Sequence, residues 1–351
     1  SVYHKSRDLS SVFNVLRVFQ QALVNCCIDN NLEAFTQRQK SDVKFTYYLL
    51  SLVDMLWFDN GGTVPSLNNS KLKDLYLPDV PLTRQVQIRA YLDTKCKKID
   101  RLISIQEEMI AELQAYKQSV ITEAVTKGLD PDVPMKDSGV EWIGYIPEDA
   151  KVVSVARLYN SILGKMVCDT PANDSDTLES YLCAINVHFD GIDLSTLKEM
   201  WFSENEKQRY LLRNGDLLVV EGGAGAGGAA IVDIADNQDL YIQNSIHLVR
   251  AYKGLAANKY LYYNLYSLVK RFYIDYVCNK ATIPHFTKEK LKETPIVYFP
   301  METQQEIINY LDTKCQNIDT MISLKKQKIE SLKEYKKSLI YECVTGKREV
   351  V

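Results

Sequence analysis

The sequence predicts an α+β fold, in which globular α/β domains are separated by two long helices that form an antiparallel coiled coil. Three observations predict it: a long segment of the sequence is repeated, each copy contains a long run without glycine or proline, and strand-like runs lie between the copies. Because the chain has 351 residues, it is long enough for two or three domains.

The repeat is clearest in the segment YLDTKC, which occurs at residues 91–96 and again at residues 310–315. At this offset of 219, residues 63–126 match residues 282–345 without a gap. Further upstream, residues 51–53 (SLV) match residues 267–269 at an offset of 216. Since a repeat of this kind determines the architecture, we expect two related structural units.

The two long helices are expected at residues 84–128 and 301–346. Their apolar residues recur at steps of three, four or seven, and the runs end at Gly128 and Gly346, which are typical helix stops. A near-heptad stripe on so long a helix requires a partner. We favour pairing of the two helices over packing of each on its own domain, because the same stripe occurs twice. The residues expected at their contact are Leu92, Ile99, Leu113, Tyr116, Leu311, Ile318, Leu332 and Tyr335.

The remaining segments are assigned in chain order. Residues 1–83 resemble the C-terminal half of a domain, and such a partial domain would expose a sheet edge, so self-association is expected. Residues 129–150 are rich in Pro, Gly and Asp and are expected to form a linker with little regular structure. Residues 151–300 are expected to form an α/β domain. It would contain strands at 217–220, 230–234 and 246–250 and a helix at 261–277.

Composition limits the classes of function. The net charge is -3, which argues mildly against a protein that binds nucleic acid alone, but not against a subunit whose partners supply positive charge. No run of 18 apolar residues occurs, so no membrane span is expected. The eight cysteines lie in apolar runs and none form a C-x-x-C pair, which favours reduced thiols, a cytoplasmic location and no metal site.

Catalysis by this chain is disfavoured, and we predict no catalytic residue and no cofactor of its own. The glycine-rich segment at residues 221–228 contains G-x-G-x-x-G, but a β-branched run follows it where a dinucleotide site needs a helix. A nucleotide-dependent enzyme is therefore only the third interpretation. No G-x-S-x-G motif, Walker A motif or histidine pair with metal-ligand spacing occurs.

Polar clusters at loops are the candidate DNA-binding residues. Gln and Asn side chains can bind adenine through two hydrogen bonds, Arg can bind guanine likewise, and bare glycine backbone can approach phosphates. Any one of these side chains alone is more simply a solvated loop residue, but several occupy duplicated positions. The candidates are Thr36, Gln37, Arg38, Gln39, Lys40, Asn60, Ser66, Asn68, Gly223, Gly225, Gln243, Asn244, Ser245, His247, Lys280, Thr282, His285 and Lys288.

Several segments resemble the specificity (S) subunit of type I restriction–modification systems. Residues 77–81 (LPDVP) with 83–88 (TRQVQI), and their second copy at 299–307 (FPMETQQEI), resemble the entry to the long helix of that family. Residues 121–129 (ITEAVTKGL) and 137–147 (DSGVEWIGYIP) are a more specific match. Residues 215–218 (GDLL) and 221–223 (EGG) resemble the core of a target recognition domain. The resemblance covers residues 40–346.

This resemblance implies a non-catalytic subunit of a bacterial defence complex. In the family, two target recognition domains each read one half of a split double-stranded DNA sequence, and the two helices set their spacing. Methyltransferase (M) subunits supply adenine methylation with S-adenosylmethionine, and restriction (R) subunits supply cleavage with ATP and Mg. This chain departs from the pattern in its first target recognition domain, which is incomplete at residues 1–83.

An interpretation of another class remains open. The chain would then be a protein-interaction adaptor with a coiled-coil stalk and no role on DNA. The acidic balance of charge favours this alternative. Lys and Arg side chains gathered on one face would favour DNA binding instead.

Overall fold

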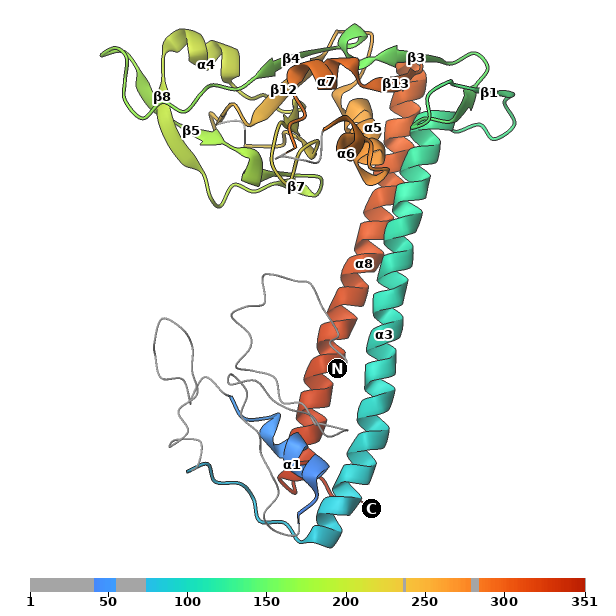
Figure 1. Cartoon of the computed structure of the whole chain (residues 1–351), viewed down its shortest axis with the longest axis vertical. Coiled ribbons are helices and arrows are strands. Elements are labelled where there is room, and N and C mark those ends of the chain that lie inside the picture. The colour runs from blue at the N-terminus through green and yellow to red at the C-terminus, as the bar shows by residue number, and fades with distance from the viewer. Residues whose placement is uncertain (1–40, 55–73, 236–237, 279–283, 351) are drawn as a thin grey trace. The chain divides into compact units, whose positions relative to one another are not determined.

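The computed structural model describes residues 41–54, 74–235, 238–278 and 284–350. The chain divides into two compact units, each described separately: unit 1 comprises residues 1–110 and 322–351, and unit 2 comprises residues 111–321. Helices, small sheets and two very long helices occur together, so the α+β prediction is confirmed (Figure 1). Among the described residues, no helix is long and apolar enough to span a membrane.

The long helices are α3 (Leu82–Lys127) and α8 (Met301–Val344), each within two residues of the predicted bounds. Both end as predicted at a glycine, because Gly128 and Gly346 have φ angles of 77° and 75°, which side chains with a Cβ rarely adopt. Each helix begins directly after a proline, whose missing N–H costs nothing at a helix start.

In unit 1, the first part of α3 packs antiparallel against the last part of α8. Arg84 donates a hydrogen bond to the Val350 carbonyl at 2.7 Å, and Asp100 pairs with Lys336 at 2.6 Å, so the numbering falls on one side as it rises on the other. Helix α1 (Val43–Leu50) covers this pair, with its N-terminus capped by Asp42. The three helices share one apolar core, which includes Phe45, Tyr48, Ile88, Leu92, Cys96, Ile99, Leu339, Ile340 and Cys343.

In unit 2, the last part of α3 packs against the first part of α8 through the repeat equivalents of the same residues. The helix side chains buried in this core are Val120, Ile121, Ala124, Val125, Ile307, Ile308, Leu311 and Cys315. The ion pair recurs as well, because Lys117 and Asp319, at 2.7 Å, are the repeat equivalents of Lys336 and Asp100. The pairing of the two helices is therefore encoded twice by the repeat, once in each unit.

Most of the residues predicted at the helix contact are buried there. Leu92, Ile99, Leu311 and Ile318 are all at most 5% exposed, and Leu113 and Leu332 are partly buried. The prediction is wrong for Tyr116 and Tyr335, which are 51% and 53% exposed. Both tyrosines fit the spacing of three and four residues, but an α-helix drifts about 20° per heptad away from a strict seven-residue repeat, so spacing alone does not fix the contact face.

Unit 2 holds a globular part built on small sheets (Figure 1). Its central sheet has the order β10-β9-β12-β4 and is antiparallel throughout. These strands are β4 (Tyr159–Leu163), β9 (Leu217–Val220), β10 (Ala229–Ile231) and β12 (Ile246–Ala251). Every residue of β9 is buried, because apolar side chains pack on both faces of this sheet.

Smaller sheets and short helices surround the central sheet. A three-stranded sheet has the order β11-β5-β8, and β13 pairs with β3. The remaining elements are β3 (Lys151–Ser154), η3 (Val155–Arg157), β5 (Thr177–Leu182), η4 (Ala184–Asn186), β6 (Val187–His188), β7 (Gly191–Ile192), β8 (Lys198–Phe202), α4 (Glu204–Tyr210), β11 (Tyr241–Ile242), α5 (Asn258–Lys270), α6 (Tyr273–Val277), α7 (Lys288–Glu293) and β13 (Pro295–Tyr298).

Two details of unit 2 differ from the sequence predictions. Residues 129–150 contain a two-stranded hairpin, β1 (Met135–Asp137) with β2 (Tyr145–Pro147), where little regular structure was expected. Its Ile143 and Ile146 are buried against α3 and α8, which stabilises it despite the glycines and prolines. The helix predicted at 261–277 is broken between α5 and α6 by Phe272, whose φ of 63° cannot continue a helix.

A buried glutamine joins each long helix to the chain that packs on it. In unit 2, Gln304 accepts a hydrogen bond from the Ala257 N–H and donates to the Phe299 carbonyl. In unit 1, Gln85 accepts from the Asp42 N–H and donates to the Val80 carbonyl. The two glutamines are 219 residues apart, but their partners Asp42 and Ala257 are 215 apart. Equivalent contacts of α1 and α5 are therefore offset by 215, and not by the 216 that the SLV match gave.

Candidate nucleic-acid interface

One end of the central sheet of unit 2 gathers polar side chains on short loops. Strand β9 ends there at Val220, next to Ile246 where β12 begins, and β4 ends there as well. We call this end the polar sheet edge. It comprises Gly164, Lys165, residues 221–228, residues 243–245 and His285. The candidates Gly223, Gly225, Gln243, Asn244, Ser245 and His285 all lie on it.

The turn at residues 243–245 is held by backbone hydrogen bonds on every side. The Gln243 N–H donates to Leu182, the Asn244 N–H donates to Lys165 at 2.8 Å, and the Ser245 carbonyl accepts from Glu221. Its three side chains are half-buried and hydrogen-bonded in sequence, because Ser245 Oγ donates to Gln243 Oε1 and Gln243 Nε2 donates to Asn244 Oδ1. The turn therefore presents fixed polar groups at a partly exposed position.

A glycine makes this arrangement possible. A Cβ added at Gly164 would lie 2.4 Å from the carbonyl oxygen of Gln243, closer than atoms can approach. Only glycine allows the strand to pass so near the turn. Sequence reasoning missed Gly164 and Lys165, although a glycine directly after the strand-like residues 159–163 is the kind of signal that marks a close backbone approach.

The glycine-rich segment 221–228 is a tightly bonded loop, and it does not form a nucleotide site. The Gly223 N–H donates to the Pro284 carbonyl, and the Gly228 N–H donates to Gly225. Strand β10 follows directly, where a dinucleotide-binding loop would need a helix. The loop packs on α6, since a Cβ at Gly227 would lie 2.7 Å from Ile274. Gly225 is exposed at the tip.

His285 and Glu221 form a polar pair beside this loop. The His285 Nδ1 lies 3.1 Å from a carboxylate oxygen of Glu221, and the histidine side chain is 56% exposed. The backbone of His285 is fixed, because its carbonyl accepts from Lys290 Nζ at 2.8 Å. Sequence reasoning missed Glu221, although it directly follows the buried strand β9. The pair combines a ring donor or acceptor with a carboxylate that accepts hydrogen bonds.

A second ion pair lies at the same edge. Lys165 Nζ contacts a carboxylate oxygen of Glu206 at 2.5 Å, and the lysine lies 5.1 Å from the Phe202 ring centroid. Burial raises the pKa of Glu206, but hydrogen bonds from Lys165 and Ser203 outweigh it and leave the pKa below its ordinary value. The lysine charge is thus neutralised within the protein, which is consistent with a surface that is not strongly basic.

His247 is not part of the polar sheet edge. It is fully buried on β12, and its Nε2 lies 3.0 Å from the Phe286 carbonyl oxygen. Burial lowers its pKa, so the ring is neutral at pH 7. Its selection as a DNA-binding candidate is therefore corrected, because a ring in the core cannot reach a base edge.

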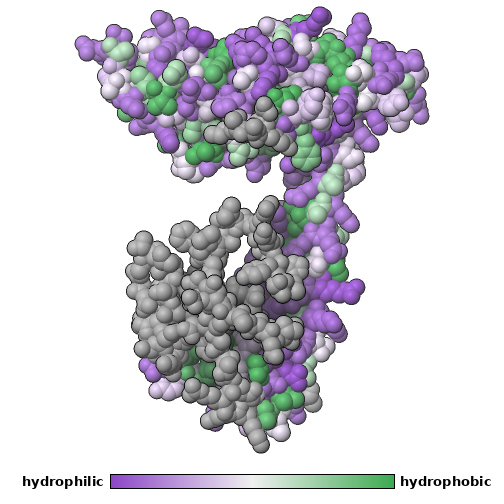
Figure 2. All heavy atoms as spheres, viewed as in Figure 1, coloured by the Kyte–Doolittle hydropathy of each residue, from purple (hydrophilic) through white to green (hydrophobic). Residues whose placement is uncertain are grey.

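The other candidates are distributed as follows. Lys288 begins α7 and is half-buried, two residues after Phe286. The remaining candidates lie outside the described residues: Thr36, Gln37, Arg38, Gln39, Lys40, Asn60, Ser66, Asn68, Lys280 and Thr282. On the face of unit 2 in Figure 2, apolar residues are interspersed with hydrophilic ones.

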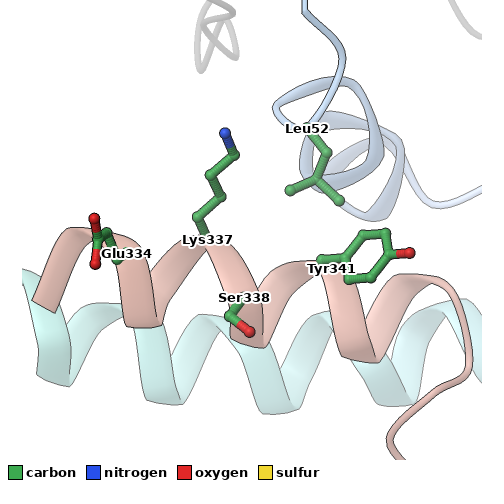
Figure 3. Close-up of a pocket in the computed structure, with 5 residues that line it drawn as sticks. All are labelled: Leu52, Glu334, Lys337, Ser338 and Tyr341. Carbon is green, nitrogen blue, oxygen red and sulfur yellow. The ribbon is translucent and has the colours of Figure 1, made fainter. Parts of the chain in front are cut away.

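Unit 1 contains a shallow pocket that offers no chemistry. In Figure 3, Leu52 faces the ring of Tyr341, and Glu334, Lys337 and Ser338 line the same depression on α8. These side chains do not converge on one point as an acid, a base and a nucleophile would. Over the described part of the chain, no three His, Cys, Asp or Glu residues are grouped as metal ligands.

Comparison with known proteins agrees with this geometry. A family described as "Type I restriction modification DNA specificity domain" matches residues 194–334. The putative type I restriction enzyme MjaX specificity subunit of Methanocaldococcus jannaschii is 26% identical over 291 residues, which cover 81% of this chain and 62% of that protein. The type I restriction enzyme MjaVIII specificity subunit of the same organism is 24% identical over 321 residues, covering 88% and 71%.

A solved structure is similar in fold. It comes from work on complex assembly and conformational transition of the type I R-M system, and it matches with a TM-score of 0.61 at 16% identity. The match covers 86% of this chain and 68% of the other. At this identity the likeness concerns the fold alone.

Proposed function

Because this chain belongs to the family of type I restriction–modification specificity subunits, we propose that it selects the DNA sequence on which partner subunits act. The observation that carries the proposal is the polar sheet edge of unit 2. There a rigid turn, a glycine-rich loop and an exposed histidine–glutamate pair present hydrogen-bonding groups from one end of a buried sheet. Side chains fixed in this way suit the reading of base edges in a DNA groove.

We further propose that the DNA target is bipartite. The support is the repeat, which gives both units the same helix-packing residues and the same lysine–aspartate pair. Two related units suit two half-sites, as the spacing of half-sites reflects the spacing of the domains that read them. The helices α3 and α8 would then act as the spacer between the half-sites.

Docking of two methyltransferase (M) subunits is proposed on exposed apolar residues of the long helices. Leu102, Ile105 and Tyr116 are exposed on α3, and their repeat equivalents Met321, Leu324 and Tyr335 are exposed on α8. Large apolar side chains left in water commonly mark contact surfaces. Because each kind of position occurs twice, two copies of one partner fit better than a single partner.

The chemistry is assigned to the partners. S-adenosylmethionine would bind the M subunits, and ATP and Mg would bind restriction (R) subunits, while this chain supplies sequence choice in the cytoplasm. The polar sheet edge supports this division, because the groups gathered there are hydrogen-bonding side chains suited to contact with base edges. Self-association through residues 1–83 stays a prediction.

Reconstitution tests the proposal. The full chain is mixed with the M subunits of its own system, S-adenosylmethionine and a plasmid library, and methylated adenines are mapped by sequencing. The proposal expects methylation at one split motif and none when this chain is omitted. Methylation without sequence preference would contradict it. The adaptor alternative, favoured by the net charge of -3, expects a complex with partner proteins but no methylated motif.

A further inference from the structure

The turn at residues 243–245 contains a chain of hydrogen bonds whose direction is fixed at its start. The backbone N–H of Ala184 donates to Ser245 Oγ at 3.0 Å, and an N–H can only donate. The Ser245 hydroxyl therefore uses its own hydrogen on Gln243, whose Oε1 accepts. This leaves the Gln243 amide nitrogen facing Asn244, where Asn244 Oδ1 accepts at 2.8 Å.

The consequence is that the Asn244 amide has one defined orientation. An isolated asparagine can exchange its oxygen and nitrogen by rotation, but here rotation would place two donors against each other. The backbone of Asn244 is fixed as well, by its N–H bond to the Lys165 carbonyl at 2.8 Å. Within the described residues, the Asn244 amide nitrogen has no hydrogen-bond partner, and the oxygen keeps one lone pair in addition to the one that Gln243 uses.

We propose that Asn244 reads adenine in the half-site of unit 2, and that Gln243 and Ser245 are positioning residues that hold its amide. This inference rests on the proposed DNA-reading function. In the major groove, adenine presents an N6 donor beside an N7 acceptor. The remaining Oδ1 lone pair accepts from N6, and Nδ2 donates to N7. Guanine presents two acceptors at the corresponding places, so it would meet the Asn244 oxygen with its own O6 and be rejected.

The other amide of the turn is excluded by its hydrogen bonds. Gln243 uses its oxygen on Ser245 and one amide hydrogen on Asn244, so it has no free oxygen–nitrogen edge of the kind that adenine requires. Its role is to transmit the orientation set by Ala184. The half-buried position of the turn makes the site accessible to a groove edge while its backbone bonds limit movement.

The test uses the complete complex of this chain with its M subunits and maps the methylated motif for each variant. For Asn244→Ala, we expect the preference for A·T at one base pair of one half-site to fall by about 10- to 100-fold, with the other half-site unchanged. Asn244→Asp, of nearly the same shape, removes the donor and should favour C·G at that position, because a carboxylate accepts from cytosine N4. Ser245→Ala should weaken the same preference, and Ser245→Thr, which keeps a hydroxyl, should restore it.

A matched control and an unmutated protein complete the test. Asn160→Ala removes an exposed amide at the opposite end of the same sheet and should leave the motif unchanged. Replacing each adenine of the half-site by 7-deazaadenine, which lacks N7, should weaken binding of the unmutated chain at one position, and Asn244→Ala should show no further loss there. The thermal unfolding midpoint of each variant reports whether it folds.

The outcomes separate this inference from the function on which it rests. An unchanged motif in Asn244→Ala and Asn244→Asp would overturn the inference while sequence selection stands. A change confined to a G·C position would overturn the adenine assignment. If the unmutated chain directs no motif at all, the proposed function itself fails.

Discussion

The substitution Gln304→Ala should separate the globular part of unit 2 from the start of α8. Gln304 is fully buried, and its side chain accepts from the Ala257 N–H at 3.1 Å and donates to the Leu255 and Phe299 carbonyls at 3.2 and 2.8 Å. Each hydrogen bond contributes about 1 kcal/mol net, so the free energy of unfolding should fall by about 3 kcal/mol. The Ala257 N–H would also lose its buried acceptor.

The assay is urea unfolding of the full chain, with the neighbouring Gln305→Ala as the matched control. Gln305 is exposed and contacts Asn309 on the same helix, so its removal should change the free energy of unfolding by at most about 0.5 kcal/mol. Gln85→Ala, which removes two such bonds in unit 1, should cost about 2 kcal/mol. A loss below about 1 kcal/mol for Gln304→Ala would refute the reasoning that three buried hydrogen bonds hold this contact.

Three further predictions concern the sheet edge, the core and the helix pair. Gly164→Ala should lower the thermal unfolding midpoint and abolish motif selection, because its Cβ would lie 2.4 Å from the Gln243 carbonyl oxygen, whereas Gly225→Ala, with only Val220 at 3.8 Å, should be tolerated; equal midpoints would contradict this. Because burial lowers the pKa of His247 in the folded state, the unfolded state binds its proton first, so stability should be full above about pH 6.5 and fall below it by up to ~1.4 kcal/mol per pH unit, and His247→Gln should remove this component from a urea titration against pH; an unchanged pH dependence would count against it. A double-mutant cycle on Lys117 and Asp319 should give a coupling of at most ~1 kcal/mol that disappears in 1 M salt, since Asp319 is half-exposed; a coupling that persists in salt would show a desolvated pair instead.

The pairing of the long helices could be predicted from the sequence because it is encoded twice. Leu92 and Leu311 occupy equivalent positions and are both fully buried, so a pattern present in two copies indicated a shared contact. The exposed Tyr116 and Tyr335 show the limit of that argument. Periodicity identifies an apolar stripe, but only the geometry of two packed helices decides which positions at its margin are covered.

The candidate site could be predicted only in part, for a physical reason that His247 illustrates. In an ordinary antiparallel sheet, alternation separates a buried face from an exposed one. In β12, Leu248 packs on one side of the sheet and Val249 on the other, so both faces are covered and no alternation remains. The residues of the turn at 243–245 were identified by their chemistry, but their hydrogen-bond order depends on Ala184, about sixty residues away, which no local pattern reveals.

The 215-residue offset of α1 and α5 has the same origin. Residues 51–53 and 267–269 have identical side chains, yet the contacts that recur are those of Tyr48 with Asp93 and Tyr263 with Asp312. The first pair lies 2.8 Å apart and the second 2.5 Å, and the tyrosines are 215 residues apart. Identity of side chains in a short segment is therefore weaker evidence of equivalence than a shared buried contact.

The most direct test of the central claim is photocrosslinking of the complete complex to target DNA that carries iodouracil, followed by mass spectrometry of the crosslinked peptides. The account predicts crosslinks from residues 221–228 or 243–245, at the polar sheet edge of unit 2. Crosslinks from unit 2 found only at the opposite end of the sheet, where Arg250 pairs with Asp216 at 2.6 Å, would contradict it.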